Sequence, residues 1–430
     1  MKKEAVSVFW FRRDLRIEDN RGLFEALHSP FPVLPVFIFD SEITDELDKD
    51  DARITFIYDT LNKLSIQLGE RSSCIYCTKG DPIAVWHTLL NKYNVKSVYA
   101  NEDYEPYAIK RDQEVAQLLH QNEIQLNLFK DQVIFAKGEV LKGDKTPYTV
   151  FTPYKNKWLE RFASESLQDY TPHSNSNFLK FEMPFPEMSE LDFTRSSIKV
   201  LNYQLDKLDD YETARNFPAK NQTSYLSPHL RFGTVSIRKV ILNITNNKTF
   251  LSELIWREFF MQILYHFPEV VSNNFKRKYD GVQWRNNPQE FEKWKAGQTG
   301  YPIVDAGMRE LNTTGYMHNR VRMVVAGFLC KHLLIDWKWG EAYFAKQLLD
   351  FELSSNNGNW QWSAGTGCDS APYFRIFNPT EQVKKFDAER VYLKKWIPEL
   401  DTLDYPSPMV DHKSARARAL ETYKKGLVDT

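Results

Sequence analysis

The chain has 430 residues, of which 42% are hydrophobic and 14% are aromatic, and its formal net charge is -1 at pH 7. This composition excludes an intrinsically disordered chain, because burial of the apolar residues can offset the entropy lost on folding. The near-zero charge excludes binding of nucleic acid through an overall positive field, so any basic surface must be local.

Residues 1–130 alternate short apolar runs with segments of helical period. The runs predict five strands, at 5–11, 31–40, 72–80, 95–103 and 124–130. Strands separated by helices predict an α/β domain with a doubly wound parallel sheet. No G-x-G-x-x-G follows the first strand, so we expect no dinucleotide in the usual position.

Two different patterns follow along the chain. Residues 131–200 are rich in Pro, Ser and polar side chains, which is typical of an interdomain connector, with one short helix expected near 154–163. After residue 200, apolar residues recur at helical spacing, for example in 249–267 and 316–337. We therefore predict an all-α domain over 201–430.

The four cysteines, Cys74, Cys77, Cys330 and Cys368, are too few and too scattered for a disulfide framework. Cys74 and Cys77 form a single CxxC pair that nothing nearby completes, so we expect strand residues and no metal site. The amino terminus lacks a secretory pattern, and no run approaches the roughly 18 apolar residues of a membrane helix. We expect a cytoplasmic monomer without a membrane partner.

Eight of the eleven tryptophans lie after residue 200. Core packing explains most single indoles but explains Trp360 and Trp362 poorly, because they stand in SSNNGNWQWSAGTG, which is too polar for a core helix. We expect a loop or a helix start there, shaped around a ligand. The helix predicted to open at HNRVRM (318–323) would place Asn319 and Met323 on one face.

Seven sequence blocks resemble the signature blocks of the photolyase and cryptochrome family. They are FWFRRDLRIEDN (9–20), TSYLSPHLRFG (223–233), ELIWREFF (253–260), GYPIVDAGMREL (300–311), TGYMHNRVRM (314–323), NNGNWQW (356–362) and APYFRIFNP (371–379). The resemblance runs over nearly the whole chain, from about Phe9 to Leu400. It implies a Rossmann-like amino-terminal domain and a helical domain that buries a U-shaped FAD.

The resemblance implies a set of cofactor-binding residues. They are Tyr211, Thr223, Ser224, Tyr225, Leu226, Ser227, Arg257, Arg322, Asp350, Glu352 and Asn356. The residues of 223–227 match a segment that holds the diphosphate, and Arg322 with Asp350 matches an ion pair beside the isoalloxazine ring. Asn356 matches the residue that faces the redox-active ring nitrogen. Glu352 stands where Asp is usual, so the longer side chain keeps the same bond only if the ring or the backbone shifts.

Three tryptophans, Trp360, Trp337 and Trp284, match the residues that pass an electron from the surface to the photoexcited flavin in this family. This role requires closely spaced, easily oxidised rings, because tunnelling decays steeply with distance. Trp294 and Trp339 have no such match, and we expect them to pack the core.

A few pocket positions separate the members of the family. In six-four enzymes, the positions of Asn319 and Met323 resemble a histidine pair. Neither residue is His here, and the thioether of Met323 cannot donate a proton. DASH-type cryptochromes usually have Gln at the Met323 position and Tyr at the Trp362 position, and plant cryptochromes have Asp at the Asn356 position. The sequence is instead similar to the class I cyclobutane pyrimidine dimer enzymes at Glu253, Trp256, Asn319, Met323 and Trp362.

The implied activity is light-driven repair of cyclobutane pyrimidine dimers in DNA by an electron from photoexcited, reduced FAD. Trp256, Trp362 and Met323 would form an apolar pocket for the flipped-out dimer, with Glu253 and Asn319 as its polar partners. Positions on the DNA-facing rim would contact phosphates without reading sequence. These positions are Arg215, Arg257, Arg320, Arg375 and Gln382. Catalytic roles are implied for Glu253, Asn356, Trp284, Trp337 and Trp360.

Two questions stay open at this stage. The alternative function is a blue-light receptor that signals through FAD photoreduction; such receptors commonly append a disordered tail, whereas the resemblance here nearly reaches Thr430, which favours the enzyme. Tyr107 and Ala108 replace the Asn and Glu that bind the folate antenna of related enzymes. A deazaflavin or flavin mononucleotide antenna is therefore favoured over folate, and an empty antenna site is equally tenable.

Overall fold

The chain folds into two compact units that interleave along the sequence. The computed structural model describes residues 3–173, 177–244 and 246–427. Unit 1 comprises Met1–Val140, Trp158–Tyr203 and Tyr225–Thr245, and unit 2 comprises Leu141–Lys157, Gln204–Ser224 and Asn246–Thr430. The predicted ranges 1–130, 131–200 and 201–430 stay a prediction, but most of 131–200 belongs to unit 1 together with 225–245.

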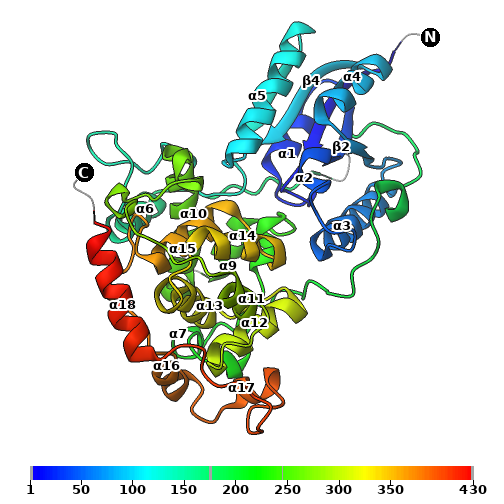
Figure 1. Cartoon of the computed structure of the whole chain (residues 1–430). Coiled ribbons are helices and arrows are strands. Elements are labelled where there is room, and N and C mark those ends of the chain that lie inside the picture. Colours follow the sequence, from blue (N-terminus) through cyan, green and yellow to red (C-terminus); the bar gives the residue numbers. More distant parts are fainter. Residues whose placement is uncertain (1–2, 174–176, 245, 428–430) are drawn as a thin grey trace. The chain divides into compact units, whose positions relative to one another are not determined.

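Unit 1 contains a five-stranded parallel sheet with the strand order β3-β2-β1-β4-β5, which Figure 1 draws in blue and cyan. The strands are β1 (Ala5–Phe11), β2 (Val33–Asp40), β3 (Tyr76–Gly80), β4 (Asn94–Asn101) and β5 (Gln125–Phe129). All five predicted strands are present, and the predicted α/β fold of this part is confirmed. Strand β3 begins later than expected, so Cys74 precedes it and only Cys77 lies within it.

Helices cover both faces of this sheet, which explains why β1 and β2 are almost uniformly apolar. Phe9 and Phe11 pack on one face with Leu61 of α3, whereas Val8 and Trp10 pack on the other face with side chains of α4 and α5. The helices of this unit are α1 (Arg21–Leu27), α2 (Ser41–Thr44), α3 (Ala52–Gly69), α4 (Pro82–Lys92), α5 (Pro106–Gln121), α8 (Ser227–Arg231) and α9 (Ile237–Ile244). A short 3₁₀ turn, η1, covers Met188–Leu191.

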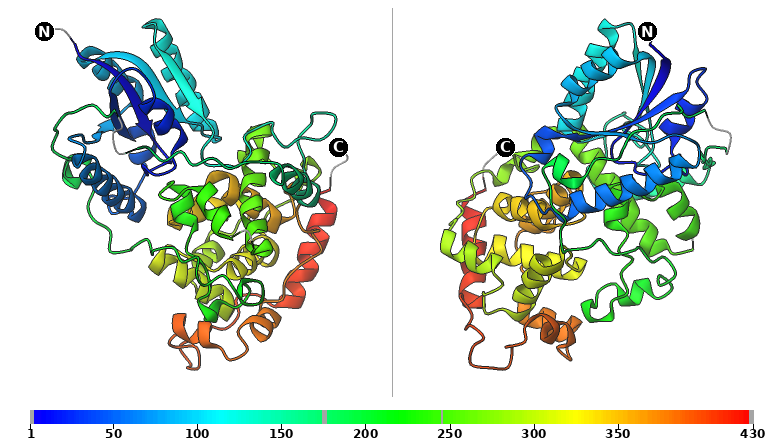
Figure 2. Two further views of the ribbon diagram at one scale, coloured as in Figure 1. Left: turned by 180° about the vertical axis from the view of Figure 1, so that it is seen from behind. Right: turned by 90° about the vertical axis from the view of Figure 1, so that its right-hand side faces the viewer.

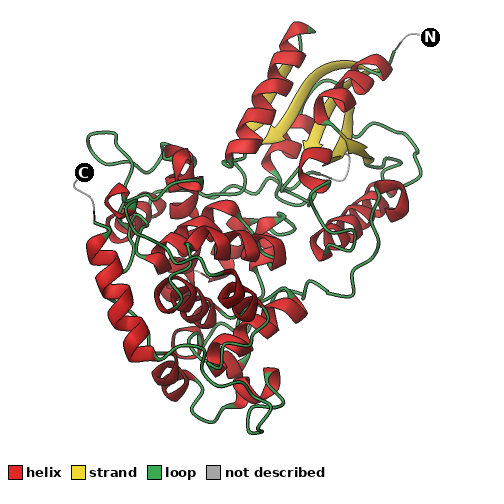
Figure 3. Ribbon diagram, viewed as in Figure 1, coloured by secondary structure: helices red, strands yellow, loops and turns green. Residues whose placement is uncertain are grey.

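Unit 2 is helical, as predicted, and Figure 3 shows in yellow that the strands of the described residues belong to unit 1. Its main helices are α7 (Tyr211–Ala214), α10 (Lys248–His266), α11 (Pro288–Lys295), α12 (Pro302–Thr314), α13 (Asn319–Gly327), α14 (Trp337–Gln347), α15 (Leu353–Ala364), α16 (Pro379–Phe386), α17 (Val391–Trp396) and α18 (His412–Lys425). Shorter turns are η2 (Pro218–Lys220), η3 (Pro268–Val271), η4 (Arg277–Tyr279) and the π-helix η5 (Phe328–His332). Helix α6 (Phe151–Phe162), expected near 154–163, begins in unit 2 and ends in unit 1.

The core of unit 2 is formed by α11 to α15, η5 and α17, and it includes fully buried Trp294 and Trp337. The C-terminal helix α18, red in Figure 2, packs against η5 and buries Tyr423. None of the helices in the described ranges combines the length and apolar character needed to cross a bilayer.

The stretch around Trp360 and Trp362 belongs to helix α15, and Ser354–Asn356 lie in its first turn, so the expected helix start is present and the expected loop is not. Its polar residues are tolerated in the interior because they bond to backbone carbonyls of a neighbouring turn. Asn357 Nδ2 donates to the carbonyl of Val270 at 3.1 Å, and Gln361 Nε2 donates to the same oxygen at 3.0 Å. These bonds satisfy the amides that made the stretch look too polar for a core helix.

Candidate functional site

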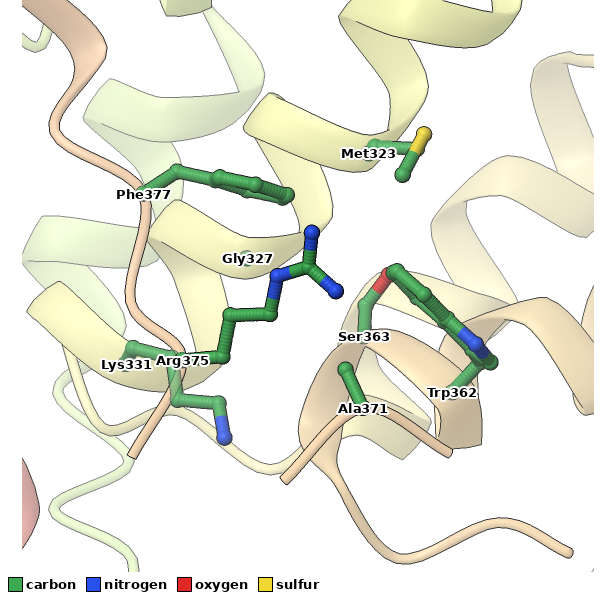
Figure 4. Close-up of a pocket in the computed structure, with 8 residues that line it drawn as sticks. All are labelled: Met323, Gly327, Lys331, Trp362, Ser363, Ala371, Arg375 and Phe377. Carbon is green, nitrogen blue, oxygen red and sulfur yellow. The ribbon is translucent and has the colours of Figure 1, made fainter. Parts of the chain in front are cut away.

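A pocket in unit 2 is built from α13, η5, α15 and the loop that precedes α16. It is lined by Met323, Gly327, Lys331, Trp362, Ser363, Ala371, Arg375 and Phe377. Figure 4 shows the Arg375 guanidinium pointing into the space between Met323, Phe377 and Trp362. The structure thus brings together three residues predicted to bind substrate, Met323, Trp362 and Arg375, around an opening that is aromatic on one side and cationic on another.

One side of the pocket is a single helical face. Met323, Gly327 and Lys331 follow one another at intervals of four residues, from α13 into the π-helix η5. Lys331 is only 2% exposed, and its Nζ donates to the carbonyl of Tyr373 at 3.1 Å, in the loop that carries Arg375. Burial lowers the pKa of Lys331 to about 7. Sequence reasoning missed this lysine, because nothing in FLCKH distinguishes it from a surface residue.

Helix α13 begins at Asn319 and is capped by the preceding residue. The Nδ1 of His318 accepts the Arg320 backbone N–H at 3.2 Å, which is the geometry of an N-cap. Asn319 is exposed at this helix start, whereas Met323 is one turn further on. The shared face predicted for the two residues therefore exists, but only Met323 reaches the pocket wall.

Glu253 lies on α10 and forms an ion pair with Arg215, the residue that follows α7. Both side chains are about one-third exposed or less. Burial raises the pKa of Glu253, while the Arg215 charge acts in the opposite direction. Burial and the nearby Glu253 carboxylate raise the pKa of Tyr211, also predicted as a ligand contact, to about 12. Tyr211, Arg215 and Glu253 are therefore electrostatically coupled neighbours.

Trp256, three residues after Glu253, is already stacked on one side. Its ring lies parallel to that of Phe151, with centroids 3.6 Å apart and an interplanar angle of 9°. Phe151 begins α6, and its backbone N–H donates to Asp369 at 3.1 Å. Phe151 was not among the predicted site residues, because the connector around it carries no periodic signal. The parallel contact fixes the Trp256 plane and covers one of its two faces.

Two rim residues carry buried polar atoms. Arg320 Nη2 donates to Asn216 at 2.6 Å, and its guanidinium lies 4.5 Å from the centre of the Phe386 ring. Burial together with the charges of Arg215 and Arg375 lowers the pKa of Arg320, so these three cations share one region. Among the described residues, nothing hydrogen-bonds to the buried Gln382 Oε1.

A second group of predicted residues consists of Asp350, Glu352 and Asn356, just before and within α15, and of the arginines that pair with the two carboxylates. Arg322 of α13 donates through Nη2 to Asp350 at 2.9 Å and through Nε to the Met317 carbonyl at 2.8 Å. Arg257 of α10 donates to Glu352 at 3.0 Å, and both of these side chains are largely buried. The pairing of Arg257 with Glu352 places it in the group predicted to hold the cofactor, rather than on an open rim.

Asn356 completes this second group on the first turns of α15. Its Nδ2 donates both to the backbone carbonyl and to the Oε1 of Glu341 on α14, each at 3.0 Å. Burial raises the pKa of Glu341, and the bond from Asn356 opposes this shift. Glu341 was not predicted from the sequence, since WKWGEAYF gives no sign that its glutamate points inward.

The three tryptophans predicted to carry electrons all belong to the core cluster of unit 2 or pack against it. Trp337 and Trp360 are 1% and 2% exposed, and Trp284 is half-buried. Gly340 lies one turn after Trp337, and a Cβ there would be 2.1 Å from Cη2 of Trp360, so the Trp360 ring lies directly on α14. Trp337 Nε1 donates to Asn274 at 2.9 Å.

Two further tryptophans behave as packing residues. Trp294 is fully buried and donates from Nε1 to the Val325 carbonyl at 3.3 Å, and Trp339 packs against the same core. Their predicted packing role agrees with these surroundings.

The remaining residues predicted to bind the cofactor lie at the point in the sequence where a segment of unit 2 ends and a segment of unit 1 begins. Thr223 and Ser224 end a segment of unit 2, and Tyr225, Leu226 and Ser227 open a segment of unit 1. Tyr225 has a φ of 50°, a left-handed conformation that is rare for an aromatic residue and is often found at ligand clamps. At the predicted antenna position in unit 1, Tyr107 donates to Asp40 at 2.7 Å and Ala108 is buried.

Comparison with known proteins accounts for most of the chain. Residues 7–173 match the DNA photolyase family, and residues 250–404 match the family described as the FAD binding domain of DNA photolyase. A deoxyribodipyrimidine photo-lyase of Escherichia coli is 36% identical over 98% of each chain, and one of Halobacterium salinarum is 35% identical over 99% of this chain and all of its own. The chain belongs to the DNA photolyase family.

Solved structures of photolyases have the same fold. A bacterial class III photolyase from Agrobacterium tumefaciens has a TM-score of 0.88 at 33% identity, covering 99% of this chain and 98% of its own. An archaeal photolyase from Sulfolobus tokodaii, which holds two FAD molecules, has a TM-score of 0.87 at 35% identity, covering 98% and 100%. A Synechocystis cryptochrome also has a TM-score of 0.87, at 26% identity, covering 98% and 100%.

The residues of this photolyase fit the flavin that the family domain binds. Asp350 holds the Arg322 guanidinium in place, which gives a fixed cation for an electron-rich ring system. The amide of Asn356 has its NH₂ group occupied by Glu341, so its carbonyl remains for a ligand. The left-handed backbone at Tyr225 lies in the segment expected at the diphosphate. A fixed cation and a free carbonyl acceptor are groups that can hydrogen-bond to the polar edge of a flavin ring.

Proposed function

We propose that this photolyase repairs cyclobutane pyrimidine dimers in DNA in a light-dependent reaction. The observation that carries the proposal is the pocket in which Trp362, Met323 and Arg375 line one opening. A dimer flipped out of a duplex loses base stacking, and an indole with a thioether replaces it with apolar contact. The guanidinium supplies a positive charge for the phosphates that flank the lesion.

The residues of the second group would hold FAD. Arg322, fixed by Asp350, and the carbonyl of Asn356 would contact the ring system, and the segment 223–227 would contact the diphosphate. Arg257 and Glu352 form a buried pair that would support the same side of the site. Bound there in its reduced form, FAD would supply on illumination the electron that opens the cyclobutane ring, and this electron would return to it afterwards.

Glu253 would act on the lesion through its proton. In the free protein its carboxylate is paired with Arg215. A DNA phosphate that draws Arg215 away would leave Glu253 without its counter-charge, in a place where burial already raises its pKa. The acid would then be protonated more readily, and it could donate a hydrogen bond to the negative charge that develops on the dimer.

The three tryptophans Trp284, Trp337 and Trp360 would serve a separate step, which returns the cofactor to its reduced form. Trp284 is the most exposed of the three, Trp337 opens α14, and Trp360 lies against the same helix. An electron from an external reductant would enter at Trp284 and leave from Trp360. Repair of a dimer by protein that is already reduced does not need this path.

The deciding experiment is a repair assay. The reduced protein is mixed with DNA that contains thymine dimers and is illuminated with near-ultraviolet or blue light, with a dark sample and undamaged DNA as controls. We expect dimers to disappear only in the illuminated sample, as measured by chromatography of the digested DNA. Persistence of the dimers while FAD photoreduction still proceeds would contradict the proposal and favour the light-receptor alternative.

A further inference from the structure

Lys331 is a buried lysine in the wall of the pocket. The residue is 2% exposed, and no carboxylate among the described residues pairs with it. Its Nζ donates to the carbonyl of Tyr373 at 3.1 Å and lies 4.2 Å from the centre of the Tyr423 ring of α18. A Cβ at Gly365, directly after α15, would be 3.3 Å from the same atom. The ammonium is therefore held by a carbonyl and an aromatic face rather than by a counter-ion.

The loop that Lys331 contacts also carries Arg375. The guanidinium of Arg375 forms no hydrogen bond or ion pair within the described part of the chain, and the residue is exposed. Its backbone N–H donates to the Pro372 carbonyl at 2.9 Å, which forms a turn that includes Tyr373. The ring of Tyr373 is parallel to that of Tyr423, with centroids 5.8 Å apart and an interplanar angle of 2°. The position of the guanidinium therefore depends on the loop backbone, which Tyr373 fixes to the interior through its carbonyl and its ring.

The strength of this attachment depends on the charge of the Lys331 amine. Burial lowers the pKa of Lys331 to about 7, so its charge changes in the neutral range. The groups around it keep their charge there, because burial raises the pKa of Cys330 and of Tyr423 and an arginine such as Arg375 stays cationic. A protonated amine donates a stronger hydrogen bond to the Tyr373 carbonyl than a neutral one, and only the protonated amine is attracted to the face of the Tyr423 ring.

We propose that Lys331 is a positioning residue for the substrate, which holds the Tyr373 carbonyl and thereby keeps Arg375 at the opening where the phosphates beside a flipped-out dimer would lie. The inference rests on the role of the pocket in the proposed function. Figure 4 shows the guanidinium in this opening, with Lys331 on the far side of it from Met323. DNA phosphates favour the protonated amine, so protonation and binding support each other. Below pH 7 the free and the bound protein both carry the charge; above pH 7 the free protein loses it, so the affinity for the lesion falls as the pH rises.

The test measures, in the dark and from pH 6 to pH 9, how tightly the FAD-loaded protein binds DNA with a thymine dimer and the same DNA without it. Lys331→Met removes the donor and the charge at similar length, Lys331→Arg keeps a cation that does not titrate, and Lys424→Met removes an exposed lysine of α18 as a control. The wild type and Lys424→Met should lose affinity for the dimer about three- to tenfold from pH 6.5 to pH 9, the size of one charge-dependent contact. Lys331→Met should bind weakly at every pH, and Lys331→Arg should bind tightly at every pH.

A double-mutant cycle separates positioning from a general effect of charge. In an Arg375→Gln background, Lys331→Met should cause almost no further loss of affinity, because the guanidinium that it positions is gone. An equal loss in both backgrounds would overturn the proposal, as would a Lys331→Met protein that matches the wild type at every pH. If Lys331→Met does not fold, Lys331→Gln gives the same pH comparison, since it keeps a donor without the charge. Equal affinity of the wild type for damaged and undamaged DNA at every pH would instead count against the proposed function.

Discussion

Substitution of Gly340 gives the sharpest test of how closely the Trp360 ring packs against α14. At a solvent-exposed position in the middle of a helix, replacing Gly by Ala stabilises a protein by about 1 kcal/mol. At Gly340 the new Cβ would lie 2.1 and 2.4 Å from two atoms of the Trp360 ring and 2.6 Å from Leu329. Carbon atoms in contact are roughly 3.5 to 4.0 Å apart, so the overlap exceeds 1 Å.

The Trp360 ring has little room to retreat, because Phe344 and Trp294 flank it at centroid distances of 4.9 and 6.2 Å. Overpacking of this kind costs about 1–3 kcal/mol, which outweighs the gain in helix propensity. We therefore expect Gly340→Ala to lower the midpoint of urea unfolding, followed by tryptophan fluorescence, and to slow FAD photoreduction.

The control is Gly69→Ala at the end of α3, where a Cβ would meet nothing within 4 Å. This variant should be as stable as the wild type or more stable. A Gly340→Ala protein that is stabilised to the same extent as Gly69→Ala would refute the close contact between Trp360 and α14.

Three other predictions can be checked directly. Trp337→Phe should block photoreduction of oxidised FAD, followed by absorption, and leave dimer repair by chemically reduced protein largely intact; equal loss of both would exclude the assigned electron path. Trp362→Ala should weaken binding of dimer-containing DNA by about 1–3 kcal/mol, the value of one stacking contact, in a titration in which undamaged DNA is the control; an unchanged affinity would place this ring outside the lesion site. Burial and the charges of Arg320 and Arg322 lower the pKa of His318 to about 4, so the unfolded chain takes up a proton as the pH falls below about 6.5 while the folded chain does not. Stability should therefore decrease from pH 6.5 toward pH 4, and the decrease should be smaller in His318→Asn, which keeps a cap acceptor; an identical pH profile for both proteins would argue against a neutral, half-buried His318.

The sequence predicted the sheet well because its signals are local. The apolar runs of β1 and β2 are buried on both faces, and their ends nearly coincide with the predicted ones. The same reasoning was only partly right for α15, because the polarity of its residues was read without the carbonyls that receive them. Val270 and Asn273, which accept from Gln361, lie about 90 residues earlier in the chain. No local pattern can reveal partners at that separation.

The candidate site likewise contains residues that the sequence could identify and others that it could not. The family blocks identified Met323, Trp362 and Arg375, which line one pocket. They did not identify Lys331, Phe151 or Glu341, whose roles depend on what the fold brings next to them. An ion pair such as Arg257 with Glu352 joins residues far apart in sequence, and only packing shows that this arginine is buried rather than exposed.

The hydrogen bond of Trp337 has a consequence for the chemistry of an oxidised indole. Removing an electron from a tryptophan makes its ring N–H strongly acidic, so the ring normally releases a proton to any base nearby. The partner here is the side chain of Asn274, whose amide oxygen is a very weak base, and the ring is 1% exposed. A hole on Trp337 would therefore remain a cation. Trp284 is half-buried, so a hole that reaches it can lose its proton to water, and this makes charge separation in the outward direction hard to reverse.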